Sequence, residues 1–190
     1  METKTAIRRV IQKRRTSFTG RKKTEADNAI YTKLVSLPVF QTSSVIFTYV
    51  SQPCEVDTRI LISNMADKKT LVVPKITNNN LSGYTIHSLS DLKKGSWGIQ
   101  EPKDFCKAAM LSDIHLFIIP LVACDRYGNR VGSGYGYFDT FLADVRVPII
   151  GLAYSFQVVN KIPIDPHDKK VDIIVTETDI YDLRNSSHAS

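Results

Sequence analysis

The sequence predicts an α/β fold, a three-layer α/β/α sandwich with a mostly parallel central sheet, as a single domain over residues 1–190. Four apolar runs, at 45–50, 114–119, 147–154 and 171–176, have the length of buried strands. Stretches with helical periodicity separate several of them. Strands that are joined through helices pair in parallel, with the helices on the faces of the sheet.

The N-terminal segment is expected to be a basic helix. Residues 1–23 hold nine Lys or Arg and one acidic residue, whereas the whole chain carries a formal charge of +6, so the basicity is local. Ile7, Val10 and Ile11 recur at helical spacing and predict a helix within residues 1–18. Lys4 and Arg8 are one turn apart and should share one edge of it. A charge run of this kind is usually a solvated face.

The next elements follow from local patterns. Residues 22–37 have helical periodicity and predict a helix that ends before Pro38. After the strand at 45–50 we expect a short helix near residues 60–65, a strand at 71–73 that Pro74 ends, and a strand at 84–89. Residues 97–102 have no periodicity and predict an ordered loop, and residues 185–190 predict a frayed tail.

Polar residues gather where the first strand ends. Ser51, Gln52 and Glu55 follow the run at 45–50 directly. Open α/β sheets bind ligands at the carboxyl ends of their strands, so this cluster is a candidate binding segment. Lys75, which follows Pro74, is likewise expected to project toward a site.

Residues 125–139 form the segment that most directly suggests chemistry. The run at 114–119 and the helical spacing that begins at Tyr137 predict a strand, a long glycine loop and a helix start. The glycines at 132, 134 and 136 lack the Cβ atoms that would keep a phosphate from the backbone N–H groups. Arg130 could add a charge-assisted hydrogen bond, and Asp139 could hold Mg²⁺ against the same phosphates.

A structural interpretation of this segment is also open. The glycines could form a tight turn, and Asp139 could be an N-cap or first-turn acid that favours the helix dipole. The spacing matches neither the P-loop nor the dinucleotide-binding fingerprint.

Several segments together resemble one enzyme family. Residues 113–142 carry the glycine segment, and the other matching motifs keep the family's order and roughly its spacing, at 4–8, 49–55, 73–75, 98–102 and 151–154. The chain resembles, over nearly its whole length, the 5-formyltetrahydrofolate cyclo-ligases, also called methenyltetrahydrofolate synthetases. The resemblance implies that ATP phosphorylates the formyl oxygen of 5-formyltetrahydrofolate, that nitrogen-10 attacks the activated carbon, and that phosphate leaves. The products would be 5,10-methenyltetrahydrofolate, ADP and phosphate.

The resemblance also implies roles for particular residues. The catalytic residues would be Arg130 and Tyr137. The ATP site would comprise Lys4, Arg8, Arg130, Gly132, Ser133, Gly134, Tyr135, Gly136, Tyr137 and Phe138. The folate site would comprise Val50, Glu55, Trp97 and Tyr137, and Mg²⁺ would be the cofactor, held by Asp139 and Asp168. Asp168 could instead be a turn residue, which is common for aspartate.

The chain departs from the usual family pattern at three positions. Ser133 stands where a larger residue is frequent, Tyr135 where Gly or Lys is frequent, and Phe138 where Tyr is frequent. Slower catalysis or an altered folate pocket would follow.

Three other functions stay open. They are a non-catalytic nucleotide- or folate-binding member of the family, an RNA-docking protein that uses the basic helix, and a ligase for another formylated substrate. Only Phe18 is aromatic within residues 1–23, so no nucleic-acid partner is expected. With no apolar run of 18 residues and no secretory signal, we expect no membrane partner. The family resemblance already begins at Lys4, so cleavage of a transit peptide would remove matching residues, and we expect a cytoplasmic rather than mitochondrial protein. We also expect a monomer or weak dimer.

Overall fold

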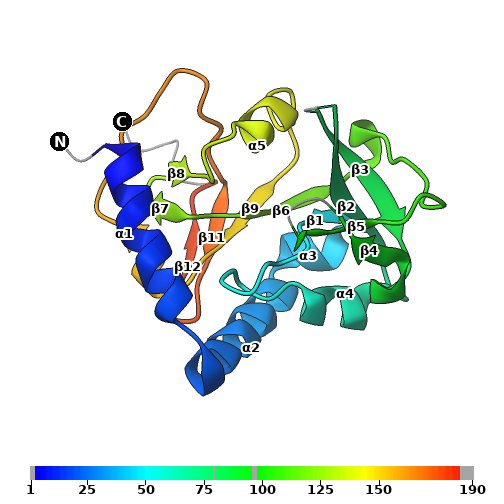
Figure 1. The fold of residues 1–190 in the computed structure, drawn as a ribbon, viewed down its shortest axis with the longest axis horizontal. Coiled ribbons are helices and arrows are strands. Elements are labelled where there is room, and N and C mark those ends of the chain that lie inside the picture. Colours follow the sequence, from blue (N-terminus) through cyan, green and yellow to red (C-terminus); the bar gives the residue numbers. More distant parts are fainter. Residues whose placement is uncertain (1–2, 79, 96–97, 185–190) are drawn as a thin grey trace.

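A seven-stranded sheet lies at the centre of the structure, a computed structural model that describes residues 3–78, 80–95 and 98–184 (Figure 1). The strand order is β12-β11-β9-β6-β1-β2-β3. The strands from β11 to β2 pair in parallel, and β12 and β3 close the two edges in antiparallel pairs. The strands are β1 Val45–Thr48, β2 Thr70–Thr77, β3 Asn80–Ile86, β6 Leu116–Pro120, β9 Ile149–Leu152, β11 Ile173–Val175 and β12 Ile180–Asp182.

Helices cover both faces of this sheet. They are α2 Gly20–Ser36, α3 Pro38–Thr42, α4 Arg59–Met65 and α5 Tyr137–Phe141, and α1 Lys4–Ser17 lies apart from them. Figure 1 shows α2, α3 and α4 on one face and α5 on the other. The three-layer α/β/α prediction is therefore confirmed, and the layer on the α5 side is thin, because α5 has only five residues.

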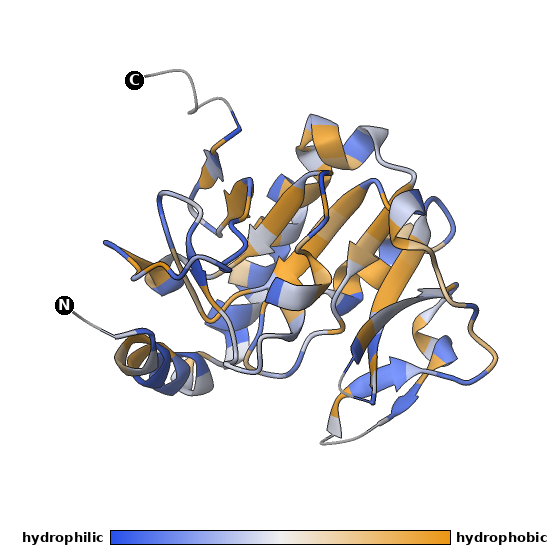
Figure 2. Ribbon diagram, turned by 90° about the horizontal axis from the view of Figure 1, so that it is seen from above, coloured by the Kyte–Doolittle hydropathy of each residue, from blue (hydrophilic) through white to orange (hydrophobic). Residues whose placement is uncertain are grey.

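The central strands are apolar on both faces because both are buried. Ile46 and Ile118 pack with the α2–α4 layer, whereas their chain neighbours Phe47 and Phe117 pack with residues of and around α5. Side chains alternate across a strand, so a continuous apolar run can serve two cores at once. The strands of the sheet are the most hydrophobic part of the molecule (Figure 2).

The first helix packs outside the main sheet. Ile7 and Ile11 of α1 contact Val122, Ala123 and Val131. These residues belong to or adjoin a small sheet of β10 Val158–Val159, β7 Ala123–Asp125 and β8 Arg130–Val131. The sequence predicts a long glycine loop between the run at 114–119 and Tyr137 and gives no indication of this sheet. Its strands have two or three residues each, which is too short for a periodic signal.

Two strand predictions have wrong boundaries. Strand β2 does not end at Pro74 but continues to Thr77, paired with β3, which starts at Asn80. The pairing between β1 and β2 ends at Val72, so the missing N–H of Pro74 removes no bond to β1. Residues Gln100–Pro102, expected as loop, form β5 and pair with β4 Leu92–Lys94. The predicted tail at 185–190 lies outside the described residues.

Candidate active site

A cavity of about 720 Å³ opens beside α1 and the carboxyl ends of β1 and β6. Every residue that the family resemblance assigns to a site, within the described ranges, lines it. These are Lys4, Arg8, Val50, Glu55, Arg130, Gly132, Ser133, Gly134, Tyr135, Gly136, Tyr137, Phe138, Asp139 and Asp168. Trp97 lies outside the described residues. Side chains from distant parts of the chain thus meet at the edge of the sheet where ligands of α/β proteins bind.

Helix α1 presents two cations to this cavity. The helix begins after Thr3, whose side chain accepts a hydrogen bond from the Ala6 N–H at 3.2 Å. Because the Ile7 and Ile11 face is buried on the small sheet, Lys4 and Arg8 face the cavity edge. Lys4 Nζ donates to Asp168 and, at 2.7 Å, to Asp165 Oδ2. Arg8 Nε donates to the Gly132 carbonyl oxygen at 2.9 Å.

Arg130 supplies a third, buried cation from β8. It is 5% exposed. Its Nε donates to the Lys169 carbonyl at 3.0 Å, and its Nη2 donates to Asp139 Oδ1 at 2.6 Å. Burial lowers the pKa of Arg130, and the carboxylates of Asp139 and Asp168 oppose that shift. An arginine stays charged under these conditions, so the site holds a fixed positive group.

The glycine segment that follows Arg130 has left-handed backbone at two positions. Gly134 has a φ of +106° and Gly136 a φ of +72°. A Cβ at Gly134 would lie 3.4 Å from Arg8 Cζ, so glycine also lets the segment approach the guanidinium closely. Gly136 is the N-cap of α5, and the predicted helix start at Tyr137 is confirmed. The first turn of α5 therefore leaves backbone N–H groups at the cavity.

Two carboxylates lie beside these cations. The Lys169 N–H donates to Asp139 Oδ1 at 3.3 Å, so the segment that contains Asp168 runs next to Asp139. Burial acts to raise the pKa of Asp168, but hydrogen bonds from the Asp165 N–H and from Lys4 lower it below the usual value. Within residues 3–78, 80–95 and 98–184, no group of three or more His, Cys, Asp or Glu is placed to hold a metal by itself. These two carboxylates could supply only part of a coordination sphere.

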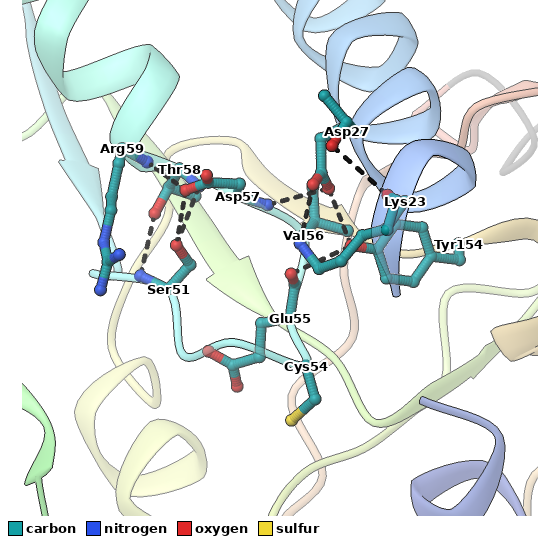
Figure 3. Close-up of polar contacts among 12 residues, drawn as sticks. Lys23, Asp27, Ser51, Cys54, Glu55, Val56, Asp57, Thr58, Arg59 and Tyr154 are labelled. Carbon is teal, nitrogen blue, oxygen red and sulfur yellow. Dashed lines mark hydrogen bonds and ion pairs between the residues drawn. The ribbon is translucent and has the colours of Figure 1, made fainter. Parts of the chain in front are cut away.

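Glu55 enters the cavity from the loop that follows β1. Its Oε2 accepts a hydrogen bond from the Gln52 N–H at 2.9 Å. Its own carbonyl accepts one from the Tyr154 hydroxyl at 3.0 Å, and that hydroxyl also lies 2.8 Å from Asp27 Oδ1. Figure 3 shows the Asp27 and Tyr154 contacts behind the loop and the Glu55 carboxylate pointing away from them. The backbone of Glu55 is thus fixed independently of its side chain.

The sequence analysis missed several cavity residues, of which Arg15 is the most informative. Arg15 lies on α1, is 5% exposed, and pairs with Glu55. Its position seven residues after Arg8 is a helical spacing that could have identified it. The expectation for Lys75 is wrong. Its Nζ pairs with Asp104 Oδ1 at 3.1 Å, because Pro74 and Ile76 take the cavity-facing positions of β2.

The three unusual residues have different surroundings. Tyr135 is 65% exposed, and its ring stacks on Tyr137 with centroids 6.0 Å apart. Phe138 packs edge-on against Phe47 of the core, with ring centroids 6.3 Å apart, so its ring contributes to core packing as well as lining the cavity. Ser133 is exposed at the cavity edge.

Comparisons with known proteins agree on one family. The sequence profile of the 5-formyltetrahydrofolate cyclo-ligase family matches residues 1–177. The 5-formyltetrahydrofolate cyclo-ligase of Escherichia coli K12 is 28% identical over 91% of this chain and 100% of its own length. The mitochondrial 5-formyltetrahydrofolate cyclo-ligase of Arabidopsis thaliana is 30% identical over 95% of this chain and 76% of its own length.

A solved structure agrees with the sequence relatives. The 5,10-methenyltetrahydrofolate synthetase of Aquifex aeolicus superimposes with a TM-score of 0.89 and 32% identity, covering 98% of this chain and 96% of that protein. In the described part of this chain, no helix is long and apolar enough to cross a bilayer. The family profile, the relatives and the fold lead to one conclusion: this chain belongs to the 5-formyltetrahydrofolate cyclo-ligase family.

Proposed function

We propose that this protein converts 5-formyltetrahydrofolate and ATP into 5,10-methenyltetrahydrofolate, ADP and phosphate. One observation carries the proposal beyond family membership. A single cavity gathers three cations and a glycine segment suited to phosphate together with the carboxylate of Glu55 and the apolar Val50, which are suited to a folate. A reaction between a nucleotide and a folate requires both groups of residues at one place.

The ATP phosphates would bind between α1 and the glycine segment. Lys4, Arg8 and Arg130 all line the cavity there, and each already donates to a carboxylate or a carbonyl oxygen. A bound phosphate would replace these acceptors with a more highly charged one. The backbone N–H groups around Gly136 would add neutral donors. Phosphoryl transfer depends mainly on such positioning and charge neutralisation.

Mg²⁺ fits the carboxylates present. Asp139 and Asp168 are hard oxygen ligands, and Mg²⁺ is commonly held by one or two carboxylates together with substrate phosphates and water. The lack of a larger ligand cluster in the described part of the chain agrees with this mode. When bound, the metal would neutralise charge on the transferring phosphate. The chain's own contribution is to hold these two carboxylates beside Arg130.

The folate would lie against Val50, Glu55 and Tyr137. The formyl oxygen would attack the γ-phosphorus, and ADP would leave. Nitrogen-10 would then attack the activated formyl carbon, and the carbon–oxygen bond would break to release phosphate, which takes up the proton that nitrogen-10 loses. The substrate therefore supplies its own nucleophiles. Arg130 and Tyr137 would orient the reacting groups, Arg130 at the phosphate and Tyr137 at the pterin or formyl group.

The direct test is the absorbance of the methenyl-folate product. Purified protein with Mg²⁺, ATP and 5-formyltetrahydrofolate should produce the methenyl band, with one ADP formed per product. A reaction without ATP is the control and should show no rise in absorbance at the methenyl band. If ATP binds but no band appears, the protein is a non-catalytic member of the family.

We also infer a cytoplasmic location and a monomeric or weakly dimeric state, as the sequence predicts. Fluorescent tagging in cells and sedimentation of the purified protein test the two inferences separately.

A further inference from the structure

Arg15 is a cavity residue, and the side-chain hydrogen bonds and ion pair that it makes with other described residues are to the loop that carries Glu55. It is 5% exposed, and its Nε donates to the Cys54 carbonyl at 2.9 Å. Its Nη2 lies 3.4 Å from Glu55 Oε1 and 3.6 Å from Cys54 Sγ. Because a guanidinium is planar, the bond from Nε to a fixed carbonyl also fixes the direction of Nη2. Arg15 therefore presents its charge to Glu55 in one orientation.

The Glu55 carboxylate keeps acceptor capacity despite these contacts. Oε1 faces Arg15, and Oε2 accepts the Gln52 N–H at 2.9 Å. An ionised carboxylate has about four acceptor positions, so each oxygen can still take another donor. The side chain is 18% exposed and lines the cavity. A pterin ring presents neighbouring N–H donors on one edge, and two adjacent carboxylate oxygens match that edge.

The backbone of the loop that carries Glu55 is held by residues other than Arg15, so positioning of the backbone can be separated from positioning of the carboxylate. The Tyr154 hydroxyl holds the Glu55 carbonyl, and the Tyr49 hydroxyl donates to the Val56 carbonyl at 2.9 Å. Asp27 Oδ1 accepts the Asp57 N–H at 3.1 Å (Figure 3). These contacts are made to backbone atoms of the loop and not to the Glu55 carboxylate. Arg15 donates to the backbone at Cys54 as well, but its Nη2 also contacts the Glu55 carboxylate.

We propose that Arg15 is a positioning residue for folate binding, which orients Glu55 toward the pterin and does not bind the ATP phosphates. This inference rests on the proposed function. The three cations that line the phosphate region donate to Asp168, Gly132 and Asp139. Arg15 instead joins α1 to the loop after β1. The first helix would thus serve the two substrates with different turns, ATP through Lys4 and Arg8 and the folate through Arg15.

The test measures the Kd of 5-formyltetrahydrofolate and of ATP by calorimetry, without turnover. The variants are Arg15→Met, Glu55→Gln and the double variant. Arg14→Met is the matched control, because Arg14 is the exposed neighbour and loses the same charge. Arg15→Lys is a second variant that keeps the positive charge but lacks the planar, branched guanidinium. It replaces Arg15→Met in the test if Arg15→Met does not fold.

We expect Arg15→Met to raise the folate Kd roughly tenfold, a typical coupling between contacting residues. The ATP Kd should stay within about twofold, and Arg14→Met should change neither. In the Glu55→Gln background, Arg15→Met should cause little further loss, because Arg15 acts through Glu55. A merely structural residue would give the full additional loss.

Full additivity in the double variant, or an equal weakening of ATP, would overturn the role of Arg15. If the wild type binds folate and shows this coupling but forms no methenyl product, only the proposed turnover fails. If the wild type binds no folate, both proposals fail.

Discussion

Arg130 and Asp139 form an ion pair across the glycine segment, with Arg130 Nη2 2.6 Å from Asp139 Oδ1. The arginine side chain is 3% exposed and the aspartate side chain 33%, so the cation is buried and its partner borders the cavity. A phosphate at the glycine segment could take over this hydrogen bond. The carboxylate would then be available to a cation, so the pair would couple the proposed phosphate and metal positions.

Asp139→Asn should impair turnover without unfolding the protein. The amide oxygen can still accept from Arg130 and from the Lys169 N–H, but it is a poor Mg²⁺ ligand. We expect kcat at limiting Mg²⁺ to fall roughly 100-fold. Rates measured against Mg²⁺ concentration test this, with Asp144→Asn as an exposed control. A variant that unfolds would favour a structural first-turn role for Asp139.

Gly136→Ala should weaken ATP binding through backbone strain alone. Its φ is +72°, and a Cβ there would meet nothing within 4 Å. Forcing an L-residue into this conformation costs about 1–2 kcal/mol. Gly20 has a φ of +67° and equally open space, but it lies at the start of α2, outside the cavity. Both Gly→Ala variants should lose similar stability in denaturant titrations, and only Gly136→Ala should raise the KM for ATP. Equal KM values would show that the glycine segment does not contact ATP.

Tyr154→Phe should loosen the loop that carries Glu55. The buried hydroxyl lies within hydrogen-bond distance of Asp27 Oδ1 and the Glu55 carbonyl. The hydroxyl has one proton to share between these two acceptors, so removing it leaves one buried acceptor without its donor, which costs about 1–3 kcal/mol of unfolding free energy. Urea titration measures the loss, and Tyr127→Phe, whose residue is 68% exposed, should cause none. A stability equal to that of the wild type would contradict the role of this network.

Cys124 should resist alkylation in the native protein. Burial raises its pKa from 9.0 to about 12, and the residue is 0% exposed. Cys54 and Cys106 are partly exposed and should react first. Thiol titration at pH 8 should therefore count two thiols in the native state and three in guanidinium. Three fast thiols in the native state would place Cys124 at the surface.

The same raised pKa predicts a pH dependence of stability. The folded thiol keeps its proton where the unfolded thiol loses it, so its contribution is fully present below pH 9. It is lost as the pH rises from 9 toward 12. The wild type should show this alkaline decline in its unfolding free energy, and Cys124→Ala should show less of it.

The sequence predicted what local patterns encode. The helical spacing around Ile7 and the continuous run that contains Phe117 each specify an element without reference to the rest of the chain. Edge strands of two or three residues such as β10 and β12 give no such signal. The sequence does not predict Arg15, because its partner Cys54 lies 39 residues away and only the packing of α1 brings the two together. The glycine segment is predicted as a phosphate site because its residue types suit phosphate wherever the neighbours lie.

We propose above that Arg130 and the glycine segment bind ATP phosphate in the cavity that also receives the folate. Calorimetry of Arg130→Ala with each substrate separately tests it most directly, beside Arg126→Ala, an exposed arginine four residues earlier. We expect Arg130→Ala to weaken ATP binding roughly 100-fold, as loss of a preorganised charged donor does, and folate binding much less. Equal weakening of both substrates, or unchanged ATP binding, would contradict the account.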